Sequence, residues 1–255
     1  MVNLSHTKNK QMSRIASVMV FLTILYSGVS KSADIKPVSI TASSWLVADG
    51  NGKIIESENI QQQRSIASIT KLMTAMVVLD AQQDLDEYIK PYTRKELLQL
   101  SLVRSDNNAA TSLCKNYPGG YEGCVAAMNR KAKSLGMNNT RFTDPTGLGV
   151  MNISTAEDLI KMTLAASRYE VIREASKTSE VKIKIRKKWL VFHNTNPIIG
   201  KRHDFIVSKT GWIRASGGCI VMMLDTDVGR KIVVVLGSKN THTRIPEAEF
   251  IATSF

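Results

Sequence analysis

Hydrophobic positions along the chain fall into three blocks with different spacing. Residues 44–57 contain two short apolar runs, residues 68–168 repeat apolar positions at helical spacing, and residues 181–236 return to short runs. Short runs bounded by turn residues are typical of strands, and repeats at three and four residues are typical of helices. This order predicts one α/β unit that holds both chain ends, with an all-helical lobe inserted. The α/β part is expected at 34–90 and 178–255, and the helical lobe at 91–177.

Local signals set the limits of these elements. Asp-Gly-Asn-Gly at 49–52 predicts a hairpin, and Gly136 is placed to end a helix. Capping boxes at 93–96 and 154–157 predict two helix starts. The predicted strands are residues 44–48, 53–57, 181–185, 189–193, 205–209, 219–224 and 231–236. The predicted helices are residues 68–82, 97–100, 107–115, 121–135, 154–168 and 246–252.

The first 33 residues have the features of a secretory signal. The basic residues Lys8, Lys10 and Arg14 precede an apolar run at 15–29, and small residues follow, so cleavage within 30–33 is expected. The run is shorter than the ~20 apolar residues of a spanning helix; an uncleaved anchor is the alternative. Either way, residues 34–255 are expected to form a single domain outside the inner membrane.

The net charge is strongly positive. The formal charge is +12, and residues 1–33 hold four of the positive charges and no acid, which leaves +8 for residues 34–255. A basic surface suits work beside an anionic polymer or a membrane surface; a basic surface kept for solubility is the alternative. Nucleic acid is not expected as a partner, because no binding motif accompanies the charge and the chain is exported.

Three cysteines are present in a chain bound for an oxidising compartment. Cys114 and Cys124 flank the turn at 117–120, which allows them to pair, although sequence alone leaves them paired or free. Cys219 lies in an apolar run and is expected to be a buried small hydrophobe.

Candidate chemistry centres on Ser68 and Lys71. They lie three residues apart at the start of a predicted helix, so both side chains point to the same face. A lysine kept neutral by burial or a nearby cation can take the proton of a serine. The pattern alone is weak, since Ser-x-x-Lys also occurs at 5–8 and 179–182. Ser68 to Lys71 is followed, however, by Ser-Asp-Asn at 105–107 and then by Lys-Thr-Gly at 209–211.

This ordered trio occurs in class A β-lactamases and penicillin-binding proteins. The chain resembles the low-molecular-mass penicillin-binding proteins, the serine D-alanyl-D-alanine peptidases, and within them the D-alanyl-D-alanine endopeptidases. The likeness extends over 66–80, 117–121, 131–142 and 145–148. It implies an α/β, β-lactamase/transpeptidase-like fold: an antiparallel sheet flanked by helices with an inserted all-helical lobe. It also implies a periplasmic enzyme that cleaves D-alanyl bonds of peptidoglycan through an acyl-enzyme.

The resemblance assigns roles by motif. Ser68 would be the nucleophile, Lys71 its base, and Ser105 the relay of a proton to the leaving amine. The backbone N–H groups of Ser68 and Trp212 would form the oxyanion hole, and Lys209 would keep Lys71 neutral. The implied substrate-binding residues are Asn107, Lys209, Thr210, Gly211 and Trp212.

Three of these residues could instead have a purely structural role. Ser105 also suits a helix N-cap, Asn107 a solvent-facing helical position, and Trp212 packing at the end of a strand. No cofactor or metal is implied, and the expected partners are peptidoglycan stem peptides and, as covalent inhibitors, β-lactams.

Two departures from the family pattern bear on substrate and location. The segment 80–93 is shorter than in the relatives, which leaves endopeptidase and carboxypeptidase preference open. The chain stops at Phe255 without a C-terminal β domain or amphipathic anchor, so no stable membrane anchor is expected after signal cleavage.

Other enzyme classes require residues that this sequence does not provide in the expected places. A serine β-lactamase of class A needs a glutamate that residues 144–154 do not contain. A penicillin or peptidoglycan sensor that acylates without turnover shares the same residues and stays open. A Ser-His-Asp triad or a zinc peptidase would draw on four scattered histidines that form no motif.

Overall fold

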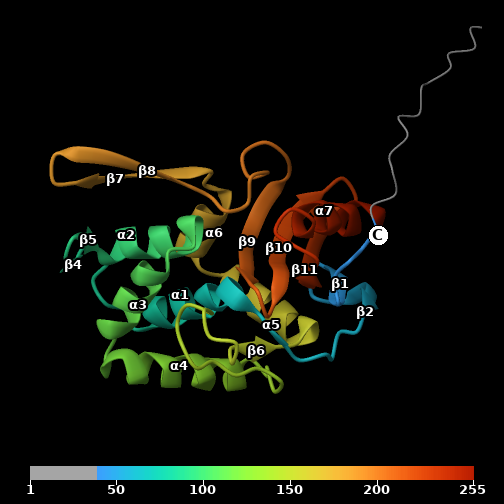
Figure 1. The fold of residues 1–255 in the computed structure, drawn as a ribbon, viewed down its shortest axis with the longest axis horizontal. Coiled ribbons are helices and arrows are strands. Elements are labelled where there is room, and N and C mark those ends of the chain that lie inside the picture. Colours follow the sequence, from blue (N-terminus) through green and yellow to red (C-terminus); the bar gives the residue numbers. More distant parts are fainter. Residues whose placement is uncertain (1–38) are drawn as a thin grey trace, which may run out of the picture. The chain divides into compact units, whose positions relative to one another are not determined.

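A five-stranded antiparallel sheet forms one part of the chain in the computed structural model, which describes residues 39–255 (Figure 1). The predicted signal segment, residues 1–33, lies outside the described residues. The strand order is β2-β1-β11-β10-β9, which puts β9 at an edge. The strands are β1 Ser44–Asp49, β2 Ile54–Glu58, β9 Asp204–Ile213, β10 Gly217–Thr226 and β11 Gly229–Ser238.

The hairpin predicted at 49–52 joins β1 and β2. Asp49 Oδ1 accepts hydrogen bonds from the backbone N–H groups of Asn51 and Lys53, both at 2.9 Å. Gly52 has a φ of +90°, which a glycine adopts without strain. The turn is therefore held by the side chain of its first residue.

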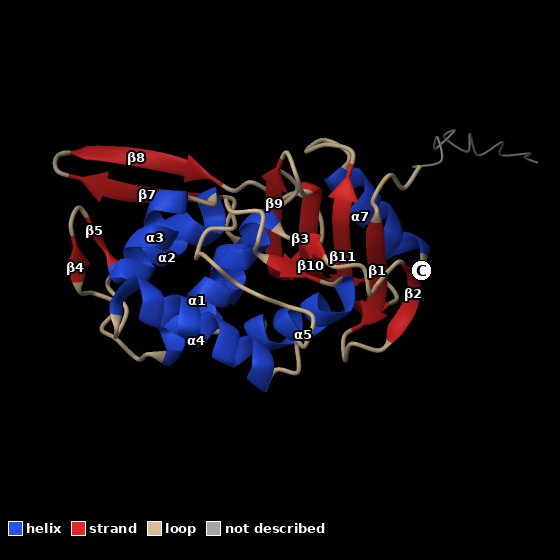
Figure 2. Ribbon diagram, turned by 60° about the horizontal axis from the view of Figure 1, so that its bottom comes forward, coloured by secondary structure: helices blue, strands red, loops and turns tan. Residues whose placement is uncertain are grey.

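The sheet buries both of its faces. Side chains alternate along a strand, so Trp45 and Val47 pack on the face covered by α7, Arg244–Ser254, whereas Leu46 and Ala48 face the larger core formed with the other helices. Figure 2 shows α7 and α5 on opposite sides of the sheet. This arrangement confirms the predicted fold class: an antiparallel sheet flanked by helices, with a helical lobe.

The helical lobe is built around α1. Nearly all of its residues are buried, including the polar Thr70, Lys71 and Thr74, and it contacts α3, α4 and α5. The helices are α1 Thr70–Asp80, α2 Arg94–Gln99, α3 Asn107–Lys115, α4 Gly120–Ser134, α5 Ala156–Ala166 and α6 Glu170–Lys177.

One of the two predicted capping boxes is present. Thr93 Oγ1 accepts from Glu96 N at 3.2 Å, and Glu96 Oε2 accepts from Thr93 N at 2.8 Å. The box predicted at 154–157 is wrong. Thr155 is the N-cap of α5, and its hydroxyl accepts from Asp158 N at 3.2 Å.

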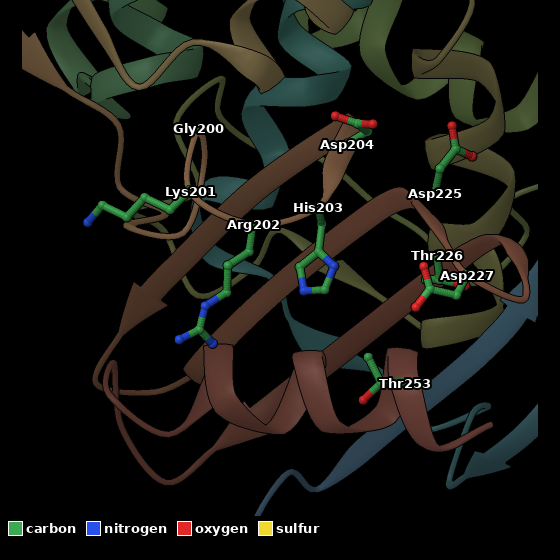
Figure 3. Close-up of a pocket in the computed structure, with 9 residues that line it drawn as sticks. All are labelled: Gly200, Lys201, Arg202, His203, Asp204, Asp225, Thr226, Asp227 and Thr253. Atoms are coloured by element: carbon green, nitrogen blue, oxygen red, sulfur yellow. The ribbon is translucent and has the colours of Figure 1, made fainter.

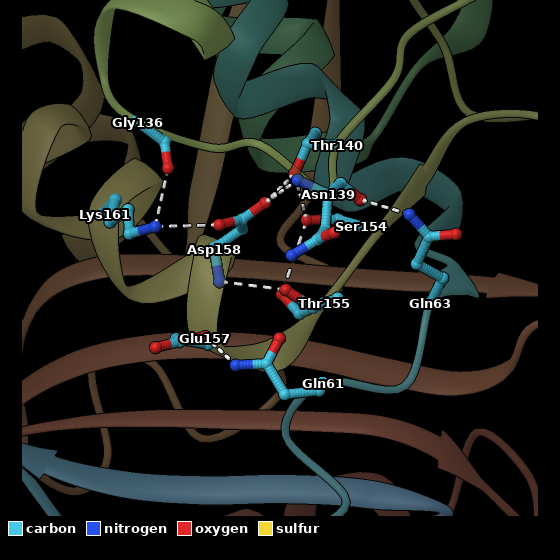
Figure 4. A network of polar contacts seen from close by, with 10 residues as sticks. All are labelled: Gln61, Gln63, Gly136, Asn139, Thr140, Ser154, Thr155, Glu157, Asp158 and Lys161. Atoms are coloured by element: carbon cyan, nitrogen blue, oxygen red, sulfur yellow. Dashed lines mark hydrogen bonds and ion pairs between the residues drawn. The ribbon is translucent and has the colours of Figure 1, made fainter.

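Pairing with another strand removes Ser154 from the cap position. Strand β6, Ile153–Ser154, pairs with β3, Arg64–Ser65. Asp158 is buried at the same place and accepts from Asn139 N at 2.8 Å and from Lys161 Nζ at 2.9 Å (Figure 4). The buried carboxylate thus ties α5 to the segment that follows α4.

Two short hairpins and a disulfide complete the lobe. The hairpin of β7, Glu180–Ile185, and β8, Lys188–His193, extends over the helices (Figures 1 and 2). Strands β4, Tyr88–Ile89, and β5, Tyr92–Thr93, form the other. Cys114 and Cys124 form a disulfide between α3 and α4, and Cys219 is a buried thiol in β10. Within residues 39–255, no helix has the length and apolar character needed to span a bilayer.

Candidate active site

Ser68 lies in a short 3₁₀ turn, Ala67–Ile69, that leads directly into α1. Ala67 has a φ of 45°, an uncommon conformation for a residue other than glycine. Two glycines close in on this turn. A Cβ at Gly147 would lie 1.8 Å from Ala67 O, and one at Gly211 would lie 3.0 Å from Ser68 N. Neither position has room for a side chain, so the nucleophile turn is enclosed by backbone.

Lys71 points from the first turn of α1 to three oxygens. Its Nζ lies 2.8 Å from Ser68 Oγ, 2.7 Å from Asn107 Oδ1 and 2.7 Å from the carbonyl oxygen of Thr146. The amide oxygen and the carbonyl can only accept hydrogen bonds. A neutral lysine amine has two N–H donors, and these two acceptors take both of them. The lone pair of the amine is then left to face the hydroxyl of Ser68.

Burial is the main cause of a neutral Lys71. The side chain is fully buried, and desolvation lowers its pKa to about 7, although the carboxylates of Asp144 and Asp106 act in the opposite direction. The sequence analysis predicted burial or a nearby cation as the cause and expected Lys209 to contribute as the cation. The charge of Lys71 does lower the pKa of Lys209, but desolvation is the largest cause of the lowered pKa of both amines.

The segment of Ser105 and Asn107 follows a π-helical turn, Leu100–Arg104. Ser105 has a left-handed conformation, with φ 61° and ψ 32°. The alternative interpretation of Ser105 as a helix N-cap is wrong, because Asp106 caps α3 by accepting from Ala109 N at 2.8 Å. Asn107 does not face solvent either, since it binds Lys71.

Lys209 comes from the edge strand β9. Its buried Nζ donates to Ser105 Oγ at 2.8 Å and to the carbonyl oxygen of Thr210 at 2.9 Å. Desolvation, Lys71 and Arg244 together hold the pKa of Lys209 well below its usual range. Hydrogen bonds therefore link Ser68 to Lys71 and Asn107 on one side, and Ser105 to Lys209 on the other.

The remaining predicted residues lie further along β9. Thr210 Oγ1 donates to Thr195 Oγ1 at 2.6 Å. Gly211 approaches the nucleophile turn, as described above. The side chain of Trp212 is 51% exposed, so it lies at the rim rather than in the packed core.

The sequence prediction missed two groups. The carbonyl of Thr146 is backbone, and no side-chain motif marks it. Arg244 is buried at the start of α7, donates to Gly211 O at 2.8 Å, and has a buried Nε without a hydrogen-bond partner. No carboxylate among the described residues forms an ion pair with it. Its place depends on the packing of α7 against the sheet, so no local signal reveals it.

The loop that supplies Thr146 is organised by Asp144. One oxygen of this carboxylate accepts from Thr146 N at 2.7 Å and from Gly147 N at 2.8 Å, and the other accepts from Gly149 N at 3.3 Å. Asp144 is therefore committed to its own loop. It does not take the place of the glutamate by which class A β-lactamases hold a deacylating water.

A separate surface hollow lies away from this site. A pocket of about 520 Å³ at the opposite end of β9 is lined by residues such as His203, Asp204 and Asp225, and contains no group of the site above (Figure 3). Residues 39–255 contain no cluster of three or more His, Cys, Asp or Glu side chains suited to a metal.

A serine beside a buried lysine, in a helical lobe packed against an antiparallel sheet, defines the serine acyl-transfer class of the penicillin-binding proteins. Solved structures of penicillin-binding proteins have a similar fold. A mutant of a Streptomyces DD-transpeptidase matches with a TM-score of 0.76 and 25% identity over 84% of this chain and 97% of the other. Ampicillin-bound penicillin-binding protein D2 from Listeria monocytogenes matches with a TM-score of 0.75 and 25% identity over 84% and 96%.

Sequence comparisons name the family. Residues 29–90 and 87–240 match the D-alanyl-D-alanine carboxypeptidase family, peptidase S11. A D-alanyl-D-alanine endopeptidase from Escherichia coli is 38% identical over 93% of this chain and 85% of its own. One from Pseudomonas aeruginosa is 38% identical over 82% and 75%. This chain belongs to the S11 family of serine-type D-alanyl-D-alanine peptidases, hydrolases of peptidoglycan metabolism.

Proposed function

We propose that this protein is a periplasmic endopeptidase that hydrolyses D-alanyl cross-links of peptidoglycan, with Ser68 as nucleophile. The observation that carries the proposal is the surroundings of Lys71. Two acceptors fix the amine, and its third contact is the hydroxyl of Ser68 at 2.8 Å. A base held in this way is ready to accept one proton from one nucleophile.

Acylation would proceed as follows. Ser68 Oγ attacks the D-alanyl carbonyl carbon while its proton passes to Lys71 Nζ. The carbonyl oxygen becomes an oxyanion held by the backbone N–H groups of Ser68 and Trp212. When the C–N bond breaks, the leaving amine receives a proton through Ser105, and an ester on Ser68 remains. Water then cleaves this ester and regenerates the hydroxyl.

The leaving residue carries a carboxylate, for which β9 and α7 supply the binding groups. Lys209 contacts Ser105, and Thr210 lies next to it on the strand. Arg244 adds a buried guanidinium whose Nε has no hydrogen-bond partner among residues 39–255. An anion placed here would meet charged hydrogen-bond donors, which form strong hydrogen bonds with carboxylates. Gly211 would keep this part of the strand close to Ser68, and Asn107 would orient the substrate amide.

The preference for cross-links is supported by relatives. Proteins described as D-alanyl-D-alanine endopeptidases share 38% identity with this chain over most of its length, compared with 28% for a carboxypeptidase of Bacillus subtilis. Trimming of free pentapeptides by the same site is the second activity, because the same carbonyl and carboxylate are presented there.

Location and inhibition follow from the same class. The signal features of residues 1–33 support export, and a disulfide suits an oxidising compartment such as the periplasm. β-Lactams are proposed as covalent inhibitors that acylate Ser68, since the related Listeria protein is described in an ampicillin-bound form.

The test is digestion of purified muropeptides by the exported protein, read by mass spectrometry. Wild type is expected to split a cross-linked dimer into monomers and to be labelled by benzylpenicillin at Ser68. Ser68→Ala is expected to lose both activities, by a factor of at least about 10³, because the acyl bond has no oxygen to form on. A penicillin adduct at another residue would contradict the proposal. Labelling without any peptide cleavage would instead identify a sensor.

A further inference from the structure

A surface groove of about 600 Å³ begins beside the proposed carboxylate site. One wall is the loop that precedes β9, including Thr195 and Ile198, and the other is the start of α7, including Arg244 and Ile245. The groove therefore lies between a loop and a helix that both contact the Lys-Thr-Gly strand.

Hydrogen bonds make the groove continuous with the active site. Thr195 Oγ1 accepts from Thr210 Oγ1 at 2.6 Å, and Thr195 N donates to the carbonyl of Val103 at 3.2 Å, two residues before Ser105. Arg244, on the opposite wall, donates to Gly211 O. The inner end of the groove is thus formed by the partners of the strand that would hold the carboxylate of the leaving residue.

The length of the groove exceeds what a terminal D-alanine needs. Arg244 and Glu249 both line it, and five residues of helix at 1.5 Å per residue correspond to roughly 7–8 Å. An extended peptide advances about 3.4 Å per residue, so about two further residues would fit. A pentapeptide ends at its carboxylate and would leave this space empty, whereas a cross-linked substrate continues beyond the cleaved bond.

The outer rim of the groove is basic. Lys201, Arg202 and His242 are exposed there. Figure 3 shows Lys201 and Arg202 leaving the loop in different directions, with Arg202 reaching toward α7. Glu249 is the acidic residue of the lining, and its carboxylate already lies 3.4 Å from Arg202 Nη1. The net field at the rim thus favours an anionic chain, and stem peptides carry free carboxylates.

On the basis of continuity, length and charge, we infer that this groove binds the second stem peptide of a cross-linked substrate, the one released with the leaving amine. The inference rests on the proposed endopeptidase function and gives it a specificity site outside the catalytic residues. Ile198 and Ile245 would contact the aliphatic part of the bridging residue, and the basic rim would bind the carboxylates beyond it.

The experiment compares a cross-linked muropeptide dimer with a monomeric pentapeptide as substrates for the exported full-length protein. Two single variants are made. Lys201→Glu reverses a charge on the loop wall, and His242→Glu introduces a negative charge on the wall formed with α7. For each, kcat/KM on the dimer is expected to fall about fivefold, mainly through KM and less at high salt, because the interaction is with exposed charges. Pentapeptide cleavage and benzylpenicillin acylation are expected to stay within about twofold, since neither ligand enters the groove.

Lys188→Glu is the matched control for Lys201→Glu, because it makes the same charge change in the β7–β8 hairpin, outside the groove. An equal fall in dimer cleavage in this control would show that overall charge is responsible and would overturn the inference. Unchanged dimer cleavage in both groove variants would also overturn the inference. An equal fall in kcat/KM on the dimer and on the pentapeptide would do the same. A wild-type protein that cleaves pentapeptide and leaves the dimer intact would refute the endopeptidase proposal itself.

Discussion

Lys71 and Lys209 are two buried amines with different surroundings. Lys71 contacts two pure acceptors and the nucleophile, whereas Lys209 contacts the hydroxyl of Ser105 and a backbone carbonyl. Desolvation lowers the pKa of both, and the positive charge of Lys71 lowers the pKa of Lys209 further. A substrate carboxylate beside Lys209 would offset that repulsion and favour its protonated form. The pair is therefore suited to work with one amine as base and the other as cation.

The pKa of Lys71 predicts an acid limb in the pH profile of acylation. Below about pH 7 the amine holds its proton and cannot accept that of Ser68, so the rate should rise about tenfold per pH unit up to about pH 6 and level off above about pH 8. The measurement is the second-order rate constant for benzylpenicillin between pH 5 and 9, with circular dichroism to check the fold.

A flat profile across this range would contradict the assignment of Lys71 as base.

The same lowered pKa has a consequence for stability. Between about pH 7 and the ordinary value of 10.5, the unfolded chain holds a proton that the native protein lacks, so this group makes stability rise with pH over that window.

Among individual residues, those that belong to sequence motifs were placed correctly near one another. Their side chains form two hydrogen-bonded groups, Ser68 with Lys71 and Asn107, and Ser105 with Lys209. Arg244 was not predicted, because only the packing of α7 brings a lone arginine against β9.

At the scale of elements, the longer strands were predicted, whereas the two-residue strands β3, β4, β5 and β6 were not, and helix starts were less accurate. β1, β2 and the β7–β8 hairpin have alternating or apolar runs with clear turns, so local pattern decides them. The start of α5 was misplaced by one residue, because pairing of β6 with β3 removed Ser154 from the cap. Helix α6 was not predicted: it directly follows α5 and has no side-chain cap of its own.

The disulfide between α3 and α4 is expected to stabilise the lobe without taking part in catalysis. It closes a loop with a sequence separation of 10, for which loop-closure entropy predicts a contribution of about 2–3 kcal/mol. Replacing both cysteines by serine should lower the free energy of unfolding in urea by this amount and leave acylation at 25 °C within about twofold.

The single Cys219→Ser variant is a useful comparison, since this residue is a buried thiol in β10 and is not part of the disulfide. Loss of acylation in the folded double variant would show that the α3–α4 link positions Asn107 and Ser105, contrary to this prediction.

At the scale of the whole molecule, the site depends on three segments that are distant in the chain. α1 provides Ser68 and Lys71 with the turn before it, the segment before α3 provides Ser105, and β9 at the sheet edge provides Lys209. The order of strands and helices predicted an α/β part and an inserted helical lobe. The distances among the three segments depend on packing across the whole domain and were not readable from sequence.

The charge of the domain leads to a prediction about its natural substrate. Residues 34–255 carry +8, and insoluble peptidoglycan is an anionic polymer. Raising NaCl from about 50 to about 300 mM should therefore slow the release of soluble fragments from sacculi several-fold, because screening weakens long-range attraction. Benzylpenicillin acylation, measured in parallel, should change by less than about twofold. An equal salt effect on both would point to the active site rather than to the surface.

The two glycines that flank the nucleophile turn restrict how this enzyme can evolve. Any residue larger than glycine at position 147 would overlap the carbonyl of Ala67, and Gly211 has similarly little space beside Ser68. Variants selected for slower reaction with an antibiotic are therefore barred from these two positions beside the nucleophile turn. Adaptation of that kind must come from more distant walls of the cleft, where side chains can be exchanged without displacing the serine.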